Sequence, residues 1–208
     1  MEILPFLLAP FLASLILTGI HTYLGVHVVE RGVIFVDLAL AQIAALGATV
    51  AILVGMDPHG TGAYWLGLAF TLLGAAVFSC ARTRRGQIPQ EAFIGIAYAV
   101  ASATAILAMS KATGETEHLK DMLVGNILAV SMRDVVKTAA LYCVIGLFHY
   151  IFRRQFLLIS TDPAGARAKG LKIGFWDFLF YASFGFVVTS SVAIAGVLLV
   201  FCYLVVPS

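Results

Sequence analysis

The sequence predicts an all-α fold, a polytopic transmembrane helix bundle with about seven spans in a single domain of residues 1–208. The 208-residue chain is 61% hydrophobic and 12% charged, with a mean hydropathy of +1.00. These values are typical of integral membrane proteins and exclude an ordinary soluble domain. Turn residues and charges divide the chain into apolar runs, most of them close to the length of about 20 residues that crosses a bilayer. The runs cover residues 3–29, 33–55, 62–81, 91–110, 134–152, 175–189 and 192–207.

The last two runs together are too long for one straight crossing. Residues 175–207 would make about 50 Å of helix, whereas the hydrocarbon core is only about 30 Å thick. Thr189, Ser190 and Ser191 interrupt the apolar sequence here, so we predict a break at these hydroxyl residues and two short crossings arranged as a hairpin. Irregular backbone at membrane depth persists only where protein or a water-filled cavity satisfies it. The three hydroxyls are therefore candidates for a translocation path.

The basic residues predict the orientation of the chain. Nine of the 13 Lys and Arg residues fall in alternate loops, and loops rich in basic residues face the cytoplasm. The N-terminus is then outside, and loops 82–90 and 153–174 are cytoplasmic. The nine residues are Arg31, Arg82, Arg84, Arg85, Arg153, Arg154, Arg167, Lys169 and Lys172.

The second run is unusually rich in small residues, with alanine or glycine at most positions from 39 to 51. Small residues let helices approach closely in lipid, so this helix is expected in the middle of the bundle. It also carries Asp37 and Gln42, and polar groups inside a membrane are functional candidates because their burial is costly. Gln42, near the midplane, indicates either a path or an interhelical hydrogen bond. Asp37 belongs either to the same path or to the interface.

Residues 117–131 show apolar positions at helical spacing between the fourth and fifth runs. They predict a short external helix that either lines an entrance, with Gly125 and Asn126 as a gate, or only covers the bundle. In the 153–174 loop, Asp162 can cap a short helix that Pro163 begins and Gly170 ends. This helix either docks a soluble partner or serves as a connector.

Several functions are excluded by missing motifs. The chain has no phosphate-binding loop, so it has no ATPase site of its own, and it has no visible hydrolase nucleophile or zinc-protease motif. The three cysteines and five histidines show no spacing typical of a metal site or a disulfide framework. A net charge of +2 with dispersed basic residues gives no indication of nucleic-acid binding.

The motifs together resemble the permease subunits of ABC importers for zinc, manganese and iron. The order and spacing of four segments are similar to that family across nearly the whole chain. The segments are Gly25–Gly32 followed by Ala39–Gly47, Leu123–Ser131, Asp162–Gly170, and Ala195–Val200 with Leu204–Pro207.

The resemblance implies a type II ABC importer permease fold and a multi-pass protein of the bacterial plasma membrane. It implies that the chain forms a homodimer or pairs with another permease, and that it carries a divalent metal ion as cargo, with no covalently bound cofactor. It also implies a cytoplasmic ABC ATPase and an external or periplasmic metal-binding protein as partners. The residues facing the ATPase would be Asp162, Ala166, Arg167 and Gly170.

Two features depart from the family pattern. Many members carry Asp-x-x-x-His in the second span; aligned on Gly47, this chain has Leu38 and Gln42 there, with Asp37 one residue earlier. An amide is a poorer transition-metal ligand than an imidazole, so the metal and its ligands stay unassigned. Members also usually continue beyond Pro207, so we expect a C-terminally truncated chain. Alternatives are import of a metal chelate, such as a siderophore or cobalamin complex, and an ATPase-independent secondary transporter or channel.

Overall fold

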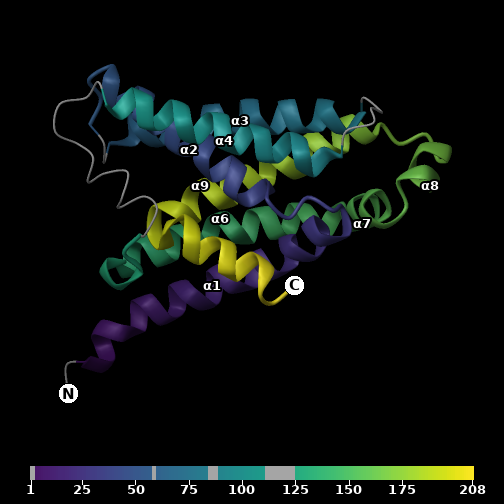
Figure 1. Cartoon of the computed structure of the whole chain (residues 1–208). Helices are drawn as coiled ribbons and strands as arrows, with labels where there is room; N and C mark the ends of the chain where they lie inside the picture. Colours follow the sequence, from purple (N-terminus) through teal and green to yellow (C-terminus); the bar gives the residue numbers. More distant parts are fainter. Residues whose placement is uncertain (1–2, 58–59, 84–88, 111–124) are drawn as a thin grey trace.

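Long helices account for most of the structure. The computed structural model describes residues 3–57, 60–83, 89–110 and 125–208, and these residues contain no strand. Helices dominate because a lipid-embedded backbone must satisfy its own polar groups. Figure 1 shows the long helices packed side by side. The elements are α1 (Ile3–Glu30), α2 (Val36–Leu53), α3 (Thr61–Thr83), α4 (Gln90–Met109), η1 (Ile127–Ala129), α6 (Met132–Ile151), α7 (Arg153–Thr161), α8 (Pro163–Ala168) and α9 (Ile173–Val205).

Six helices among the described residues are long and apolar enough to cross a membrane: α1, α2, α3, α4, α6 and α9. The first five correspond to the first five predicted spans. The sixth and seventh predicted spans both lie within α9, which has 33 residues. The prediction of a helical membrane bundle is therefore confirmed, with one helix in the place of the last two spans.

The predicted break at Thr189, Ser190 and Ser191 is wrong in position. These residues are helical, and the break lies at Gly196, which has φ 74° and ψ 162°. Ser190 and Ser191 donate to Phe186 O and Val187 O at 2.9 and 2.7 Å, so their hydroxyls bond within the helix and do not interrupt it. Glycine adopts a positive φ without steric cost.

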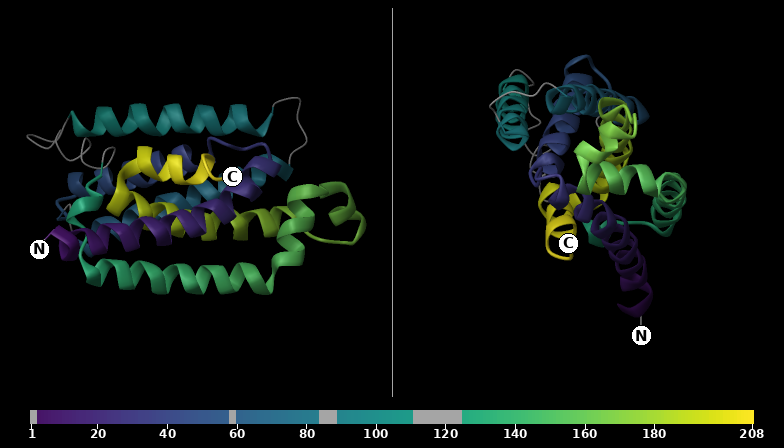
Figure 2. Two further views of the ribbon diagram at one scale, coloured as in Figure 1. Left: turned by 90° about the horizontal axis from the view of Figure 1, so that it is seen from below. Right: turned by 90° about the vertical axis from the view of Figure 1, so that its right-hand side faces the viewer.

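The bend at Gly196 reverses the chain. The yellow end of α9 runs back beside the other helices (Figures 1 and 2). The segment after the bend, 197–205, is about 14 Å long, which is too short to cross a bilayer. The predicted hairpin thus exists, and the part of its second arm in residues 197–205 is shorter than a crossing.

The second helix, α2, lies at the centre, as its small residues predict. Two thirds of its span (67%) is buried, the largest share among the six candidate spans, and it packs against α3, α4 and α9. A Cβ on Gly47 would lie 2.8 Å from the Gly67 Cα of α3. The two helices therefore approach closely only because these positions lack side chains.

The bundle has two distinct ends (Figure 1). The η1 end comprises residues 54–57, 60–61 and 125–131 and the bend at Gly196. The α8 end comprises residues 31–35, α7 and α8. Residues 153–174, expected to be a polar loop with one short helix, contain two helices. The proposed external helix of residues 117–131 lies partly outside the described residues; within them, only the short η1 is present.

Aromatic side chains hold α7 against the bundle. Phe156 of α7 is fully buried and lies 4.4 Å, centroid to centroid, from the stacked His149 ring of α6. Its ring centroid also lies 5.5 Å from Trp176 and 6.2 Å from Phe180, both on α9. Aromatic packing of this kind adds to the stabilisation that burial provides, and it fixes the α8 end.

Candidate functional site

Hydroxyl groups connect α6, α9 and α1 in the interior of the bundle. The Tyr142 hydroxyl lies 2.5 Å from Ser191 Oγ and 3.1 Å from Ser190 Oγ. Ser191 Oγ lies 3.3 Å from Nε2 of His21 on α1. Tyr142 stands about 15 Å along α6, about half the thickness of a hydrocarbon core. Three helices thus share one polar contact near mid-membrane depth.

Thr189 makes a separate contact with α3. Its Oγ1 lies 3.3 Å from Thr71 Oγ1, and the Thr71 hydroxyl is 2.9 Å from Gly67 O. Thr189 and Ser191 are buried, whereas Ser190 is partly exposed. All three predicted hydroxyl residues therefore make interhelical contacts, but they do not form one cluster. Of the three, Ser190 lines a cavity at one end of the bundle.

That cavity, of about 670 Å³, opens at the η1 end. Asn126 and Ser190, predicted separately as gate and path residues, both line it. Asp134, Lys137 and Thr138 from the first turns of α6 add polar groups to its wall. The Lys137 Nζ lies 3.9 Å from Asp134 Oδ1. The structure thus brings two predicted residues, 64 positions apart, to a common polar opening.

Gly125 lies next to this opening but contacts α9 rather than the cavity. A Cβ on Gly125 would overlap the backbone of Ala195 and Gly196, and its φ is +65°. Both features require glycine. Gly125 therefore positions the η1 segment against the bend of α9.

Asp37 and Gln42 lie inside the bundle and away from this cavity. Asp37 is 1% exposed, and neither carboxylate oxygen has a hydrogen-bond partner in the described part of the chain. Asp37 is therefore enclosed by the protein, and its assignment to the path stays a prediction. Gln42 is 6% exposed. Five positions apart on α2, the two side chains leave the helix in directions about 140° apart, so they belong to different packing interfaces.

A buried ion cluster at the α8 end was not predicted from the sequence. Nη1 atoms of Arg31 and Arg82 donate to the same oxygen, Asp177 Oδ1, at 2.7 and 2.8 Å. The side chains of Arg31 and Asp177 are 0% exposed and that of Arg82 is 14% exposed. Arg31 Nε also donates to Ser160 Oγ at 2.9 Å, and Arg82 Nη2 donates to Ile159 O at 3.1 Å. The cluster therefore joins the ends of α1 and α3 to α7 and α9.

Two positive groups face one carboxylate in this cluster, so it carries an excess positive charge. Burial lowers the pKa of the Arg31 guanidinium from its ordinary value, and the nearby Asp177 carboxylate opposes that shift. Arginine nevertheless stays protonated in proteins. The Arg31 guanidinium carbon lies 3.9 Å from the Phe180 ring centroid, a favourable cation–π geometry. Removing one partner from such a buried set is strongly destabilising.

The residues predicted to face an ATPase lie on and around α8. Asp162 caps the helix, since its Oδ1 accepts the Gly165 N–H at 2.9 Å. Gly170 follows with φ 77°. Ala166 is fully buried against Ile159 and Ile173. Of the four predicted residues, Asp162, Arg167 and Gly170 are therefore exposed, whereas Ala166 attaches α8 to the bundle.

Comparison with protein families decides the class of the chain. Residues 3–208 match the family described as the ABC 3 transport family. The chain belongs to this family. A probable iron transport system membrane protein of Haemophilus influenzae is 27% identical over 196 residues, which are 94% of this chain and 70% of that protein. The manganese transport system membrane protein MntC of Listeria monocytogenes is 25% identical over 203 residues, which are 98% of this chain and 70% of that protein.

Among solved structures, PsaBC from Streptococcus pneumoniae in complex with Fab has the same fold. Its TM-score is 0.73 at 25% identity, and the match covers 96% of this chain and 70% of that one. The resemblance inferred from sequence motifs is thereby confirmed. This ABC 3 chain is an integral membrane permease of the metal transport type, with manganese and iron systems among its relatives.

Three histidines of this ABC 3 chain, His21, His27 and His149, form hydrogen bonds within the bundle. His149 Nε2 lies 2.8 Å from Ser183 Oγ, and His27 Nδ1 lies 2.9 Å from Ser160 Oγ. Within the described ranges, no group of three or more His, Cys, Asp or Glu side chains is arranged to hold a metal ion. His59 and His118 lie outside these ranges. No resident metal centre is therefore visible in the described part of the chain.

Proposed function

We propose that this chain is the translocating subunit of an ATP-driven importer for a divalent transition metal: zinc, manganese or iron. Membership of the ABC 3 transport family across residues 3–208 is the observation that carries this proposal. The metal is cargo that passes through the permease, not a resident cofactor. ATP is hydrolysed by a separate cytoplasmic ABC ATPase, and a metal-binding protein outside the membrane delivers the ion.

The cavity at the η1 end is the proposed entrance. Asn126 and Ser190 line it, and Ser190 Oγ is 3.1 Å from the Tyr142 hydroxyl further inside. Oxygen and amide groups can replace part of the hydration shell of a divalent ion, but they bind transition metals weakly. Weak binding suits a path, because an ion must leave each position as readily as it enters.

The α8 end is the proposed cytoplasmic face. The basic residues of the loops there agree with the positive-inside rule, which puts the N-terminus outside. Arg167 on α8 is exposed beside the buried Ala166 anchor. We propose that α8 docks the ATPase, and that the Arg31–Asp177–Arg82 cluster passes movement of α7 to α1, α3 and α9.

We propose that two permease copies form one path between them. The support for this is the pairing that the resemblance to the family implies. Asp37 of α2 has a buried carboxylate without a partner, and such a group is costly unless something compensates it. A passing cation would compensate it.

Metal uptake by cells tests the proposal. The permease is co-expressed with its ABC ATPase, and accumulation of radioactive zinc and manganese is compared with that of cells carrying an ATPase inactivated in its Walker motifs. We expect ATPase-dependent accumulation of one metal and its reduction in Gln42→Ala. Uptake that persists with the inactive ATPase would indicate a secondary transporter or channel instead.

Import of a metal chelate is the second candidate, because Gln42 stands where the family pattern has histidine. An amide in place of an imidazole fits a cargo that brings its own ligands. Uptake of an iron–siderophore complex or cobalamin, in cells that accumulate neither free metal, would favour this alternative.

A further inference from the structure

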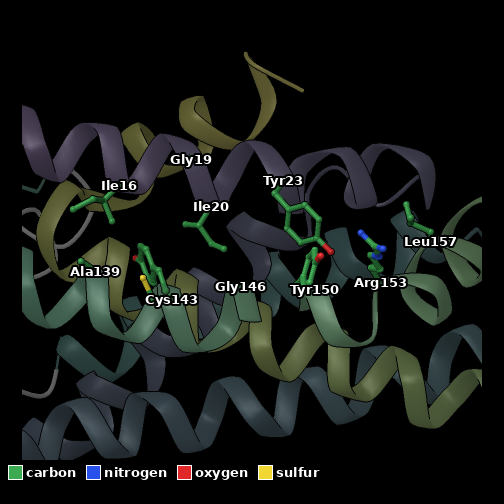
Figure 3. Close-up of a pocket in the computed structure, with 11 residues that line it drawn as sticks. Ile16, Gly19, Ile20, Tyr23, Ala139, Cys143, Gly146, Tyr150, Arg153 and Leu157 are labelled. Carbon is green, nitrogen blue, oxygen red and sulfur yellow. The ribbon is translucent and has the colours of Figure 1, made fainter. Parts of the chain in front are cut away.

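A groove on the outer surface of the bundle lies between α1 and α6, and Tyr142 is the one residue it shares with the proposed metal path. It encloses about 530 Å³ and is lined almost entirely by apolar atoms. Figure 3 shows α1 residues facing α6 residues along its length, with Arg153 and Leu157 of α7 at one end. Exposed apolar side chains flank it, among them Leu15, Val144 and Leu147. An exposed apolar face of this kind fits contact with lipid.

Small residues form the middle of the groove. Gly19 on α1 and Gly146 on α6 both line it, and a Cβ added to either would meet no atom within 4 Å. Their missing side chains leave an open channel between two helices, of a size that ordinarily holds one small ligand.

The length and ends of the groove indicate what fills it. From Ala139 to Tyr150 the groove extends about 17 Å along α6, close to the thickness of one leaflet, about 15 Å, of a hydrocarbon core of about 30 Å. Its α8 end carries Arg153, whose guanidinium carbon lies 4.8 Å from the Tyr150 ring centroid. A tyrosine in the last turn of a span, followed by an arginine just beyond it, is typical of the membrane interface. The groove therefore has an apolar channel one leaflet long and a cation at headgroup level.

We propose that this groove binds one anionic phospholipid, with an acyl chain along Gly19 and Gly146 and the phosphate at Arg153. Arginine pairs well with phosphate oxygens, and basic pockets between helices at the cytoplasmic face bind anionic headgroups. The N-terminus of α7 at Arg153 lacks a side-chain cap, and the positive end of a helix dipole favours an anion. A helix from a second copy of this chain in the groove would not provide an anionic partner for the Arg153 guanidinium.

Native mass spectrometry of the purified chain, titrated with phosphatidylglycerol or phosphatidylcholine of equal chain length, tests this site. We expect one phosphatidylglycerol to bind more tightly than phosphatidylcholine, and Arg153→Gln to weaken it about tenfold, as expected for a lost charge-assisted hydrogen bond. Arg154→Gln removes the same charge from the same helix, but Arg154 does not line the groove. It should weaken binding less than about fivefold.

Gly146→Leu tests the apolar half of the site. The leucine fills the channel and has a higher helix propensity than glycine, so the helix stays folded. Binding of phosphatidylglycerol should be lost, whereas Gly95→Leu, at an equally open position on α4, should leave it unchanged. Equal binding of the two lipids, or equal effects of each variant and its control, would overturn the proposal. So would a protein dimer that Gly146→Leu dissociates.

Discussion

Gly125 and Gly196 meet backbone to backbone at the η1 end, where a Cβ on Gly125 would overlap the amide nitrogen of Gly196. Both have a positive φ, 65° and 74°. This contact holds the segment that begins at Gly125 against the bend of α9. Because Asn126 lines the adjacent cavity, the glycine pair sets the shape of the proposed entrance.

Gly125→Ala should therefore destabilise the protein. A left-handed conformation costs an alanine about 1–2 kcal/mol, and the overlap with backbone atoms cannot be relieved by a side-chain rotation. The free energy of unfolding, measured by denaturant titration in detergent, should fall by at least about 1 kcal/mol. Gly95→Ala, at an open helical position, should be neutral or slightly stabilising. Equal effects of the two substitutions would show that the contact is unimportant.

Asp177→Asn tests the ion cluster. The change leaves the buried Arg31 without a negative partner and should cost about 3–5 kcal/mol of unfolding free energy. The matched control is Asp162→Asn, because asparagine caps helices as well as aspartate does; its effect should be below about 0.5 kcal/mol. Similar small losses in both variants would contradict the role assigned to Arg31 and Asp177.

Tyr142→Phe removes the hydroxyl shared by α6 and α9. Ser190 and Ser191 would lose a partner, and we expect a loss of about 1–3 kcal/mol in unfolding free energy together with slower transport. Tyr150→Phe, on the same helix but 63% exposed, should leave both quantities nearly unchanged. Transport at the normal rate in a destabilised Tyr142→Phe protein would limit this residue to a structural role.

The orientation is testable by labelling single cysteines in a cysteine-free background. Lys169→Cys near α8 should react with a membrane-impermeant maleimide only after the cells are permeabilised, because positive loops stay inside. Lys137→Cys, whose native side chain is 65% exposed at the η1 end, should react in intact cells. The reverse pattern would place the N-terminus in the cytoplasm.

The helical bundle could be predicted well from the sequence because a membrane-spanning segment must consist mostly of apolar residues. Runs of apolar residues give the spans, and the small residues around Gly47 predict the central position of α2, which the close approach to Gly67 explains. The Asp162 cap could also be predicted from the sequence, since helix capping depends on residues close to one another in the chain.

The remaining features depend on contacts between distant segments. Hydroxyl residues at 189–191 can either break a helix or bond to the preceding turn, and only the packed structure shows that the break lies at Gly196. Arg31 and Arg82 served only to predict topology, although both bind Asp177. The one available signal was Asp177 itself, the only charged residue in the apolar sequence of α9.

Reconstitution into liposomes tests directly whether the permease and its ATPase transport a metal ion at the expense of ATP. The permease and its ATPase are placed in liposomes with the metal-binding protein and the metal on the outer face of the permease, and ATP on the ATPase face. We expect metal accumulation on the ATPase side that requires ATP hydrolysis and falls in Gln42→Ala. Accumulation that is independent of ATP, or none for any of the three metals in a folded and assembled complex, would contradict it.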